Sequence, residues 1–340
     1  MKIDLRSDTL TKPTPEMLDF MMKADVGDDV YKEDPSVNEL ERRIADMFGM
    51  DSALYFPTGS MTNQAAIKIH THPGEQLIAD AYAHVYNYEG GGVSFNSGVS
   101  CKLLTGDRGM ITASQVEEAI NPPDFYHSPL TTLVCLENTT NKGGGACYDF
   151  EEIHKIKAVC DHHNLGFHLD GARLWNAMVA NNENPKEYGH VFDTISVCLS
   201  KGLGAPMGSV LVGKQQFMDK AIRVRKILGG GMRQVGYMAA AGIYALDHHM
   251  DRMSIDHQRA KELGLQLEQL SFVDYVSPVD TNIVIFKLND SPLKQQFVNQ
   301  LSDNQISISD MGQGKLRIVT HLDYSKEQHE SFLMFLKGYE

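Results

Sequence analysis

The sequence predicts an α/β protein whose larger part is a mostly parallel β-sheet with helices on both faces. Short apolar runs, which are typical of buried strands, alternate with segments of helical periodicity along most of the chain. The length of 340 residues, of which 42% are hydrophobic, is sufficient for a large core. No Pro/Gly/Ser-rich linker divides the chain, so we expect any second domain to share the core of the first.

Five apolar runs are expected to be strands of this sheet: residues 53–56, 132–136, 166–169, 194–198 and 209–212. Between them, apolar residues recur at helical spacing, for example over 37–48, 61–70 and 150–162. The pattern S-x-x-E, which often begins a helix as a capping box, occurs at Ser36 and at Ser114.

The pattern changes near residue 250. A helix is predicted over 257–270, a strand over 284–286, a second helix over 293–301 and a second strand over 316–319. We therefore predict a large domain over residues 1–250 and a small C-terminal α+β domain over residues 251–340.

Composition excludes several classes of function. Lys and Arg number 31 against 44 for Asp and Glu, and the net charge of -13 opposes binding to nucleic acid or to an anionic membrane. No stretch approaches the roughly 20 apolar residues of a spanning helix. The five cysteines form no C-x-x-C pair, which favours a reducing, cytoplasmic location.

A turn that suits phosphate follows the first predicted strand. Thr58, Gly59 and Ser60 lie between this strand and a helix, where hydroxyls and free backbone N–H groups favour an anion. The same turn is also consistent with a simple helix cap.

Two ionisable residues follow later strands. Asp170 ends a buried run, where a carboxylate needs a positive partner, either Arg173 or a cationic ligand such as the protonated ring of pyridoxal phosphate. Lys201 follows the next run and is either a solvated residue or, in a partly dry pocket, a Schiff-base lysine. A phosphate turn, an Asp and a Lys in this chain order favour a pyridoxal-phosphate site.

Seven segments resemble the low-specificity L-threonine aldolases, a family of fold type I in the aspartate aminotransferase superfamily. They are Asp4-Leu5-Arg6-Ser7-Asp8-Thr9, Gly27-Asp28-Asp29-Val30-Tyr31, Pro57-Thr58-Gly59-Ser60-Met61-Thr62-Asn63, Leu136-Glu137-Asn138-Thr139, Leu169-Asp170-Gly171-Ala172-Arg173, Leu199-Ser200-Lys201-Gly202-Leu203-Gly204-Ala205-Pro206 and Gly229-Gly230-Gly231-Met232-Arg233-Gln234. The resemblance spans roughly residues 3–240 in order and implies a mostly parallel seven-stranded sheet.

The resemblance also implies roles for single residues. Lys201 resembles the lysine that holds the cofactor, Asp170 the carboxylate on its pyridine nitrogen, and His84 the histidine that stacks on its ring. The phosphate cradle is expected at Thr58, Gly59 and Ser60. The groups that hold the substrate carboxylate or the phenolic oxygen of the cofactor are expected at Ser7, Tyr31, Arg173 and Arg317.

Two basic residues flank the glycine triplet of the last segment. Lys226 and Arg233 resemble groups that reach the phosphate of a neighbouring subunit, which implies a homo-oligomer with a dimer as its minimal unit and a tetramer as its expected form. Without the resemblance, this segment is equally consistent with a solvated basic helix end. Thr140 departs from the family, in which a histidine is common at this position.

The implied reaction is cleavage of L-threonine, L-allo-threonine and related β-hydroxy-α-amino acids to glycine and an aldehyde. His84, His127 or a water held by them is expected to remove the β-hydroxyl proton. A β-eliminating lyase or an aminotransferase on the same scaffold is the alternative. A binding protein or a nicotinamide-dependent oxidoreductase is the rival from another class. No metal site is expected, because the His-His pairs at 162–163 and 248–249 lack ligand spacing.

Overall fold

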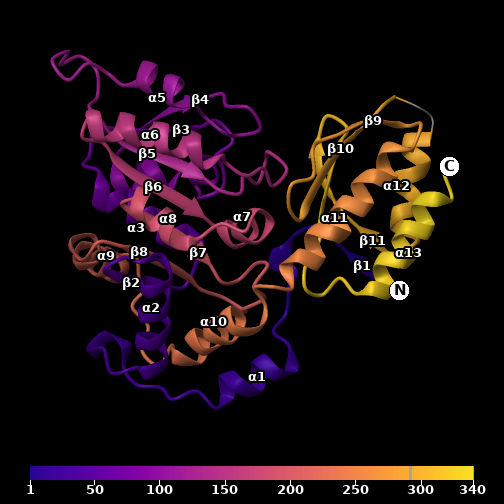
Figure 1. Cartoon of the computed structure of the whole chain (residues 1–340), viewed down its shortest axis with the longest axis horizontal. Coiled ribbons are helices and arrows are strands. Elements are labelled where there is room, and N and C mark those ends of the chain that lie inside the picture. Colours follow the sequence, from indigo (N-terminus) through magenta and orange to yellow (C-terminus); the bar gives the residue numbers. More distant parts are fainter. Residues whose placement is uncertain (291–292, 340) are drawn as a thin grey trace.

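The computed structural model describes residues 1–290 and 293–339 and has two lobes, each built on its own sheet (Figure 1). The larger lobe holds seven strands in the order β2-β8-β7-β6-β5-β3-β4. These strands are β2 (Ser52–Phe56), β3 (Gln76–Asp80), β4 (Ser100–Leu104), β5 (Thr131–Glu137), β6 (Gly166–Gly171), β7 (Thr194–Cys198) and β8 (Ser209–Gly213). Six strands run in one direction and β8 runs opposite to them, so the predicted mostly parallel sheet is confirmed.

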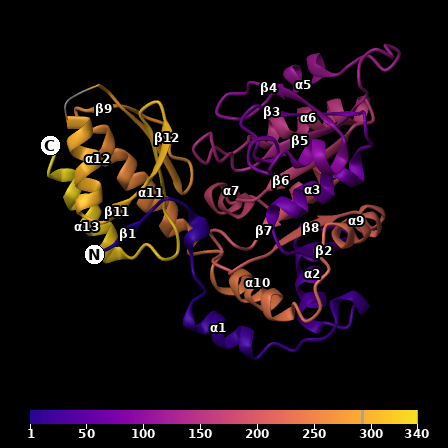
Figure 2. The same cartoon turned by 180° about the vertical axis from the view of Figure 1, so that it is seen from behind.

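Helices cover both faces of this sheet, as Figure 2 shows from behind. One face carries α2 (Pro35–Phe48), α6 (Phe150–His162), α7 (Leu174–Asn181), α8 (Pro185–Val191) and α10 (Gly236–His248), and the other carries α3 (Gly59–His70) and α9 (Gln215–Ile227). Side chains alternate along a strand, so Ala53 and Tyr55 of β2 face the first set while Leu54 and Phe56 face the second.

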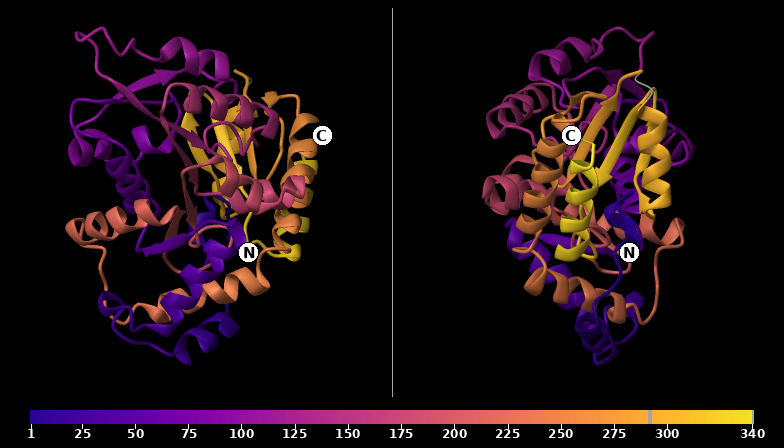
Figure 3. Two further views of the ribbon diagram at one scale, coloured as in Figure 1. Left: turned by 60° about the vertical axis from the view of Figure 1, so that its left-hand side comes forward. Right: turned by 90° about the vertical axis from the view of Figure 1, so that its right-hand side faces the viewer.

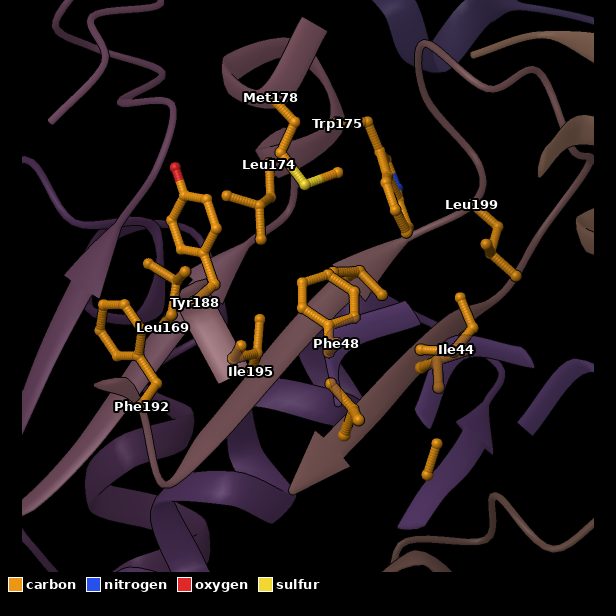
Figure 4. Packing of buried hydrophobic residues seen from close by; sticks show 14 of the residues in the cluster. Ile44, Phe48, Leu169, Leu174, Trp175, Met178, Tyr188, Phe192, Ile195 and Leu199 are labelled. Carbon is orange, nitrogen blue, oxygen red and sulfur yellow. The ribbon is translucent and has the colours of Figure 1, made fainter. Parts of the chain in front are cut away.

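The main core lies between the sheet and the first set of helices. Figure 4 shows Phe48 of α2 and Trp175 of α7 packed beside Ile195 of β7. The Trp175 indole N–H donates to the carbonyl of Cys198 at 2.8 Å, so its single polar atom is satisfied. Burying a side chain such as Phe48 contributes about 1.5–3 kcal/mol to stability.

The helices α2 and α5 (Ala113–Ala119) are capped by earlier residues than the predicted Ser36 and Ser114, and of these two only α5 has a capping box. The N-cap of α2 is Asp34, whose side chain accepts the Val37 N–H at 3.1 Å. The Ser36 hydroxyl donates instead to the Asp25 carbonyl. The N-cap of α5 is Thr112 rather than Ser114. Only the residue just before the first turn has the extended backbone that a cap requires, and both serines lie inside their helices.

The smaller lobe is an antiparallel sheet with helices on its outer face, and both termini lie in it (Figures 1 and 3). Its strands follow the order β12-β13-β10-β9. Its elements are α11 (Met253–Glu268), β9 (Val273–Val276), β10 (Ile283–Leu288), α12 (Leu293–Asp303), β12 (Ser309–Gly312), β13 (Lys315–Val319) and α13 (Lys326–Lys337). Leu316 and Ile318 face the helices, so Arg317 between them faces the larger lobe.

The first residues of the chain pack with the last. β1 (Ile3–Asp4) pairs with β11 (Ile306–Ser307), and Ile3 and Leu5 belong to the core of the smaller lobe. The division into residues 1–250 and 251–340 stays a prediction, and this N-terminal strand crosses it.

The other helical segments are η1 (Asp8–Leu10), α1 (Pro15–Met22), η2 (Asp29–Tyr31), α4 (His84–Asn87) and a π-helical turn (Val93–Ser97). In the described residues, no helix has both the length and the apolar character needed to cross a membrane.

Candidate active site

A pocket of about 330 Å³ lies beyond the carboxyl ends of the parallel strands, where ligands of such sheets bind. Of the residues that the sequence singles out, its lining includes Thr58, Gly59, Ser60, His84 and Lys201. Cavities of about 440 and 460 Å³ elsewhere in the described chain hold none of the predicted site residues. The chemistry of the side chains, rather than size, therefore identifies the site.

The phosphate end of the pocket is the start of α3. The Thr58 side chain caps this helix by accepting the Met61 N–H at 3.1 Å, while the N–H groups of Gly59 and Ser60 have no acceptor within the first helical turn. A Cβ on Gly59 would lie 2.6 Å from the Cys198 sulfur, so a larger residue would fill the cradle. The arrangement fits a phosphate group.

The other end of the pocket, called the ring end because the ring of the cofactor is expected there, lies beside a carboxylate with one unsatisfied oxygen. Asp170 is buried, and its Oδ1 accepts the Ala172 N–H at 3.1 Å, whereas Oδ2 has no hydrogen-bond partner in the described part of the chain. Its neighbour Arg173 pairs instead with Asp8, with two N···O distances of 2.8 and 2.7 Å. The alternative in which Arg173 neutralises Asp170 is therefore excluded, and a protonated pyridine nitrogen fits the orphaned oxygen.

His84 lies beside Asp170 and is held by a buried carboxylate. Its Nδ1 lies 3.0 Å from Oε1 of Glu89, whose side chain is fully buried and also accepts from Asn63 at 2.9 Å and Gln64 at 2.6 Å. Burial alone would lower the pKa of His84, but this hydrogen bond and the charges of Asp170 and neighbouring carboxylates outweigh it and raise the pKa. The ligand atoms of His84, Glu89 and Asp170 lie within 4.8 Å of one another, which is close enough to bind a metal ion. The Glu89 oxygens, however, already accept hydrogen bonds from the amides of Asn63 and Gln64.

A second carboxylate, Glu137 at the end of β5, ties two loops of the site together. It accepts the backbone N–H of His84 at 2.7 Å and that of Asn141 at 2.8 Å. Burial and the charge of Asp170 raise the pKa of Glu137 to about 7. Sequence reasoning missed Glu89 and Glu137, although the position of Glu137 after an apolar run is the same signal that identified Asp170.

Lys201 reaches the pocket from the loop after β7. Its Nζ lies 3.4 Å from the Cys198 sulfur, and its backbone carbonyl accepts the Thr11 hydroxyl at 3.2 Å. The positive charge of Lys201 also helps to lower the pKa of Asp8. Burial alone would raise the pKa of Asp8, but the charge and hydrogen bonds of Arg173 lower it to about 2.

Arg317 approaches from the smaller lobe. It donates to Asn141 Oδ1 at 2.7 Å and to the Arg6 carbonyl at 3.1 Å, while its buried Nε has no partner among the described residues. Burial and the nearby charge of Arg173 lower its pKa, so the two guanidinium groups lie close enough to repel. A carboxylate between them would relieve this repulsion. Ser7 lies next to Asp8, and its hydroxyl oxygen accepts the Thr9 N–H at 3.2 Å.

The pocket lining of this single chain lacks eight of the predicted site residues: Ser7, Asp170, Arg173 and Arg317, whose contacts are given above, and Tyr31, His127, Lys226 and Arg233. His127 is on an exposed loop, and its ring contacts that of Tyr126. Arg233 pairs with Asp28 at 2.8 Å and lies over the ring of Tyr31, which is 70% exposed. Lys226 is exposed in the last turn of α9. Their roles stay predictions.

Thr140, the departure from the family pattern, is buried away from the pocket lining. Its hydroxyl donates to the Arg108 carbonyl at 2.9 Å, and its N–H donates to Ala146. The residue therefore holds the loop that follows β5.

Comparison with known proteins supports the assignment of this site to a pyridoxal-phosphate enzyme. Residues 4–291 match the family described as beta-eliminating lyase. The chain is 38% identical to a low-specificity L-threonine aldolase of Arabidopsis thaliana, over 94% of this chain and 91% of the relative. It is 39% identical to the low specificity L-threonine aldolase of Escherichia coli (strain K12), over 96% of both.

Solved structures show the same fold. Leishmania major threonine aldolase superposes with a TM-score of 0.85 at 21% identity over 99% of both chains. Sphingomonas wittichii serine palmitoyltransferase superposes with a TM-score of 0.77 at 16% identity, over 99% of this chain and 87% of the other. The prediction of a fold type I architecture is confirmed. The protein belongs to the beta-eliminating lyase family and, within it, to the low-specificity L-threonine aldolases, which are pyridoxal-phosphate-dependent carbon–carbon lyases.

Proposed function

We propose that this enzyme cleaves L-threonine, L-allo-threonine and related β-hydroxy-α-amino acids to glycine and an aldehyde, which is acetaldehyde for the first two. The observation that carries the proposal is the orphaned Oδ2 of buried Asp170, which suits a protonated ring nitrogen. When bound, pyridoxal phosphate supplies an acceptor for the electrons of the broken carbon–carbon bond.

The side chains of this chain bind and orient the reactants. Thr58, Gly59 and Ser60 would hold the phosphate, and Lys201 would hold the cofactor between turnovers. The guanidinium groups of Arg173 and Arg317, together with the Ser7 hydroxyl, would hold the substrate carboxylate. By fixing the carboxylate, these groups would orient the substrate so that its Cα–Cβ bond is the one placed to break.

His84 is proposed to take the β-hydroxyl proton, directly or through a water. With the Nδ1 proton donated to Glu89, Nε2 is left to accept, because no described residue hydrogen-bonds it. His127 is the second candidate. Because it is exposed and does not line the pocket of its own chain, it would act in the site of another subunit.

Product analysis tests this function. L-Threonine, L-allo-threonine and L-serine are supplied to the holoenzyme, and glycine, aldehyde, 2-oxo acid and ammonia are measured. We expect glycine and acetaldehyde in equal amounts from both threonine isomers. The family description as beta-eliminating lyase makes elimination the specific alternative, and 2-oxobutanoate with ammonia from threonine would overturn the proposal.

We further propose that the active enzyme is a homo-oligomer, with a dimer as the minimal unit and a tetramer as the complete form. The exposed Lys226, Arg233 and Tyr31 support it, since exposed basic and aromatic groups that do not line the local pocket suit a partner's site. A cytoplasmic location is proposed because all five cysteines are free.

Subunit mixing tests the shared site. We expect Lys201→Ala and Arg233→Gln each to be nearly inactive alone when assayed at a pyridoxal phosphate concentration that saturates only an intact site. If Arg233 serves the partner's phosphate, mixed dimers contain one intact site, so dissociation and reassembly of the two variants together restores activity. Failure of mixed dimers to regain activity would contradict the shared site and leave the proposed reaction intact.

A further inference from the structure

We propose that Arg108 is a positioning residue that ties the smaller lobe to the larger one and so places the groups that hold the substrate carboxylate. Arg108 does not line the pocket. The inference rests on the proposed function, because it assumes that Arg317 and Arg173 bind that carboxylate.

The Arg108 guanidinium bridges the lobes with three hydrogen bonds. Nε donates to the Gly143 carbonyl of the larger lobe at 2.9 Å. The other two nitrogens cross to the segment between β9 and β10, where one donates to Asp280 Oδ2 at 2.7 Å and the other to the Pro278 carbonyl at 2.8 Å. A lysine has no planar fork of donors and would not make this set of contacts.

The backbone of Arg108 is fixed as firmly as its side chain. The residue has a φ of 51°, in the left-handed region, and its carbonyl accepts the Thr140 hydroxyl at 2.9 Å. A Cβ on Gly143 would lie 1.8 Å from this same carbonyl oxygen, so the two loops touch at a glycine. Arg108 is therefore anchored in the larger lobe before it reaches across.

On the side of the smaller lobe, the segment that Arg108 holds leads directly to the site. Thr281 donates to the Gly145 carbonyl at 2.9 Å. Asn282 donates weakly to Asp8 Oδ2 at 3.4 Å, and Asp8 is the ion-pair partner of Arg173. Residues 278–282 thus connect Arg108 to one of the two proposed carboxylate-binding arginines.

The loop on the larger lobe leads to the other arginine. Asn141 lies two residues before Gly143 and accepts from Arg317 at 2.7 Å. Its own N–H donates to Glu137 at 2.8 Å, which fixes this loop to the end of β5. If Arg108 were removed, the contacts at Asn141 and Thr281 would still join the lobes. The only ion pair that residues 278–282 make with the larger lobe, among the described residues, would be lost.

Two reagents with the same reactive group provide the test. Aminooxyacetate and methoxyamine both attack the cofactor through an O–NH₂ group, and only aminooxyacetate carries a carboxylate. For the holoenzyme of Arg108→Gln, we expect the spectroscopic rate constant with aminooxyacetate to fall about tenfold relative to wild type, while that with methoxyamine is unchanged. KM for L-threonine should rise by a similar factor, with kcat changed much less.

Three further variants make the result decisive. Asp280→Asn should show the same selective loss in smaller degree, and the double variant should be no worse than Arg108→Gln alone. Asp280→Asn also keeps the test open if Arg108→Gln does not fold. Arg43→Gln removes an ion pair with Asp247 inside the larger lobe and should affect neither reagent.

Equal losses with both reagents, or no loss with either, would overturn the role of Arg108. A wild-type enzyme whose spectrum responds to neither reagent would instead refute the proposed cofactor chemistry, so the two failures are distinguishable.

Discussion

The two ends of the pocket are built in different ways. At the ring end, the buried side chains of Asp170 and Glu89, with His84 beside them, are fixed by hydrogen bonds within one chain. At the phosphate end, the groups that face a ligand are backbone N–H groups and hydroxyls at the start of α3. The two cations that are predicted to reach a phosphate, Lys226 and Arg233, are exposed outside the pocket.

This difference has a physical reason. A buried carboxylate is stable only if its surroundings are built around it, so the ring end must be preorganised by the chain itself. The start of a helix attracts a phosphate through its free N–H groups without any further construction. We therefore expect substitutions at the ring end to affect the chemistry and those at the phosphate end to affect cofactor affinity.

The largest effect is expected for Asp170→Asn. Without the negative charge, the ring nitrogen loses the partner that keeps it protonated, and kcat should fall on the order of 10²–10³-fold. Steady-state kinetics at saturating pyridoxal phosphate measures this change.

Asp80→Asn is the matched control for this substitution. Asp80 also ends a parallel strand of the sheet and is buried, but both of its oxygens are satisfied, by the N–H groups of Tyr82 at 2.7 Å and Gly106 at 2.8 Å. We expect a loss of stability without a comparable loss of kcat. Equal losses of kcat in the two variants would contradict the special role of Asp170.

Glu89→Gln should have the next largest effect. Because Glu89 helps to raise the pKa of His84, its neutralisation should move the acidic limb of the kcat/KM profile to lower pH and reduce the maximum about tenfold. A pH–rate profile measures both changes. The control is Glu75→Gln, which removes a half-buried carboxylate that pairs with the exposed His72 and does not line the pocket. An acidic limb that does not move would show that His84 does not depend on Glu89.

The ring-end network also extends to His168, which predicts acid sensitivity. His168 lies 3.3 Å from Asn63, and Asn63 in turn donates to Glu89. Burial lowers the pKa of His168 to about 3 and that of His70, which shares a contact with Thr194, to about 4.

The sign of this effect follows from linkage. Both histidines are neutral in the folded protein and titrate near 6.5 when unfolded, so their contribution to stability is present above pH 6.5 and is lost as pH falls toward 4 and 3. The free energy of unfolding should fall by about 1.4 kcal/mol per pH unit for each histidine. Urea denaturation at several pH values measures it, and His168→Gln should flatten the slope while His248→Gln, on an exposed helix end, should not.

Sequence predicted those parts of the molecule whose signal is local. The runs at β5, β6 and β7 are apolar because both of their faces are buried. Two strands of the sheet were missed, β3 and β4. Only Leu77, Ile78 and Ala79 of β3 are apolar, and Ser100 and Lys102 interrupt the pattern of β4, which lies at the sheet edge. Asp170 and Lys201 were predicted because they follow apolar runs.

Partners distant in the chain carried no such signal. Arg173 pairs with Asp8, 165 residues away, rather than with its neighbour Asp170. Glu89 becomes part of the site only when α3 packs against the turn that carries it, because its amide partners Asn63 and Gln64 lie on α3. The cofactor framework was thus predictable from the sequence, while the hydrogen bonds that tune it were not.

The smallest effect is expected at the phosphate end, for Thr58→Ala. Thr58 and Thr112 both cap a helix by accepting the N–H of the third helical residue, so either alanine variant should lose about 1 kcal/mol of stability. Only Thr58 faces the pocket, where its hydroxyl proton is available to a phosphate oxygen. Thr58→Ala should therefore weaken pyridoxal phosphate binding about tenfold, with kcat at saturating cofactor nearly unchanged. Fluorescence titration of the apoenzyme measures this affinity; equal weakening in Thr112→Ala would mean that the phosphate end responds to helix stability rather than to a contact with the ligand.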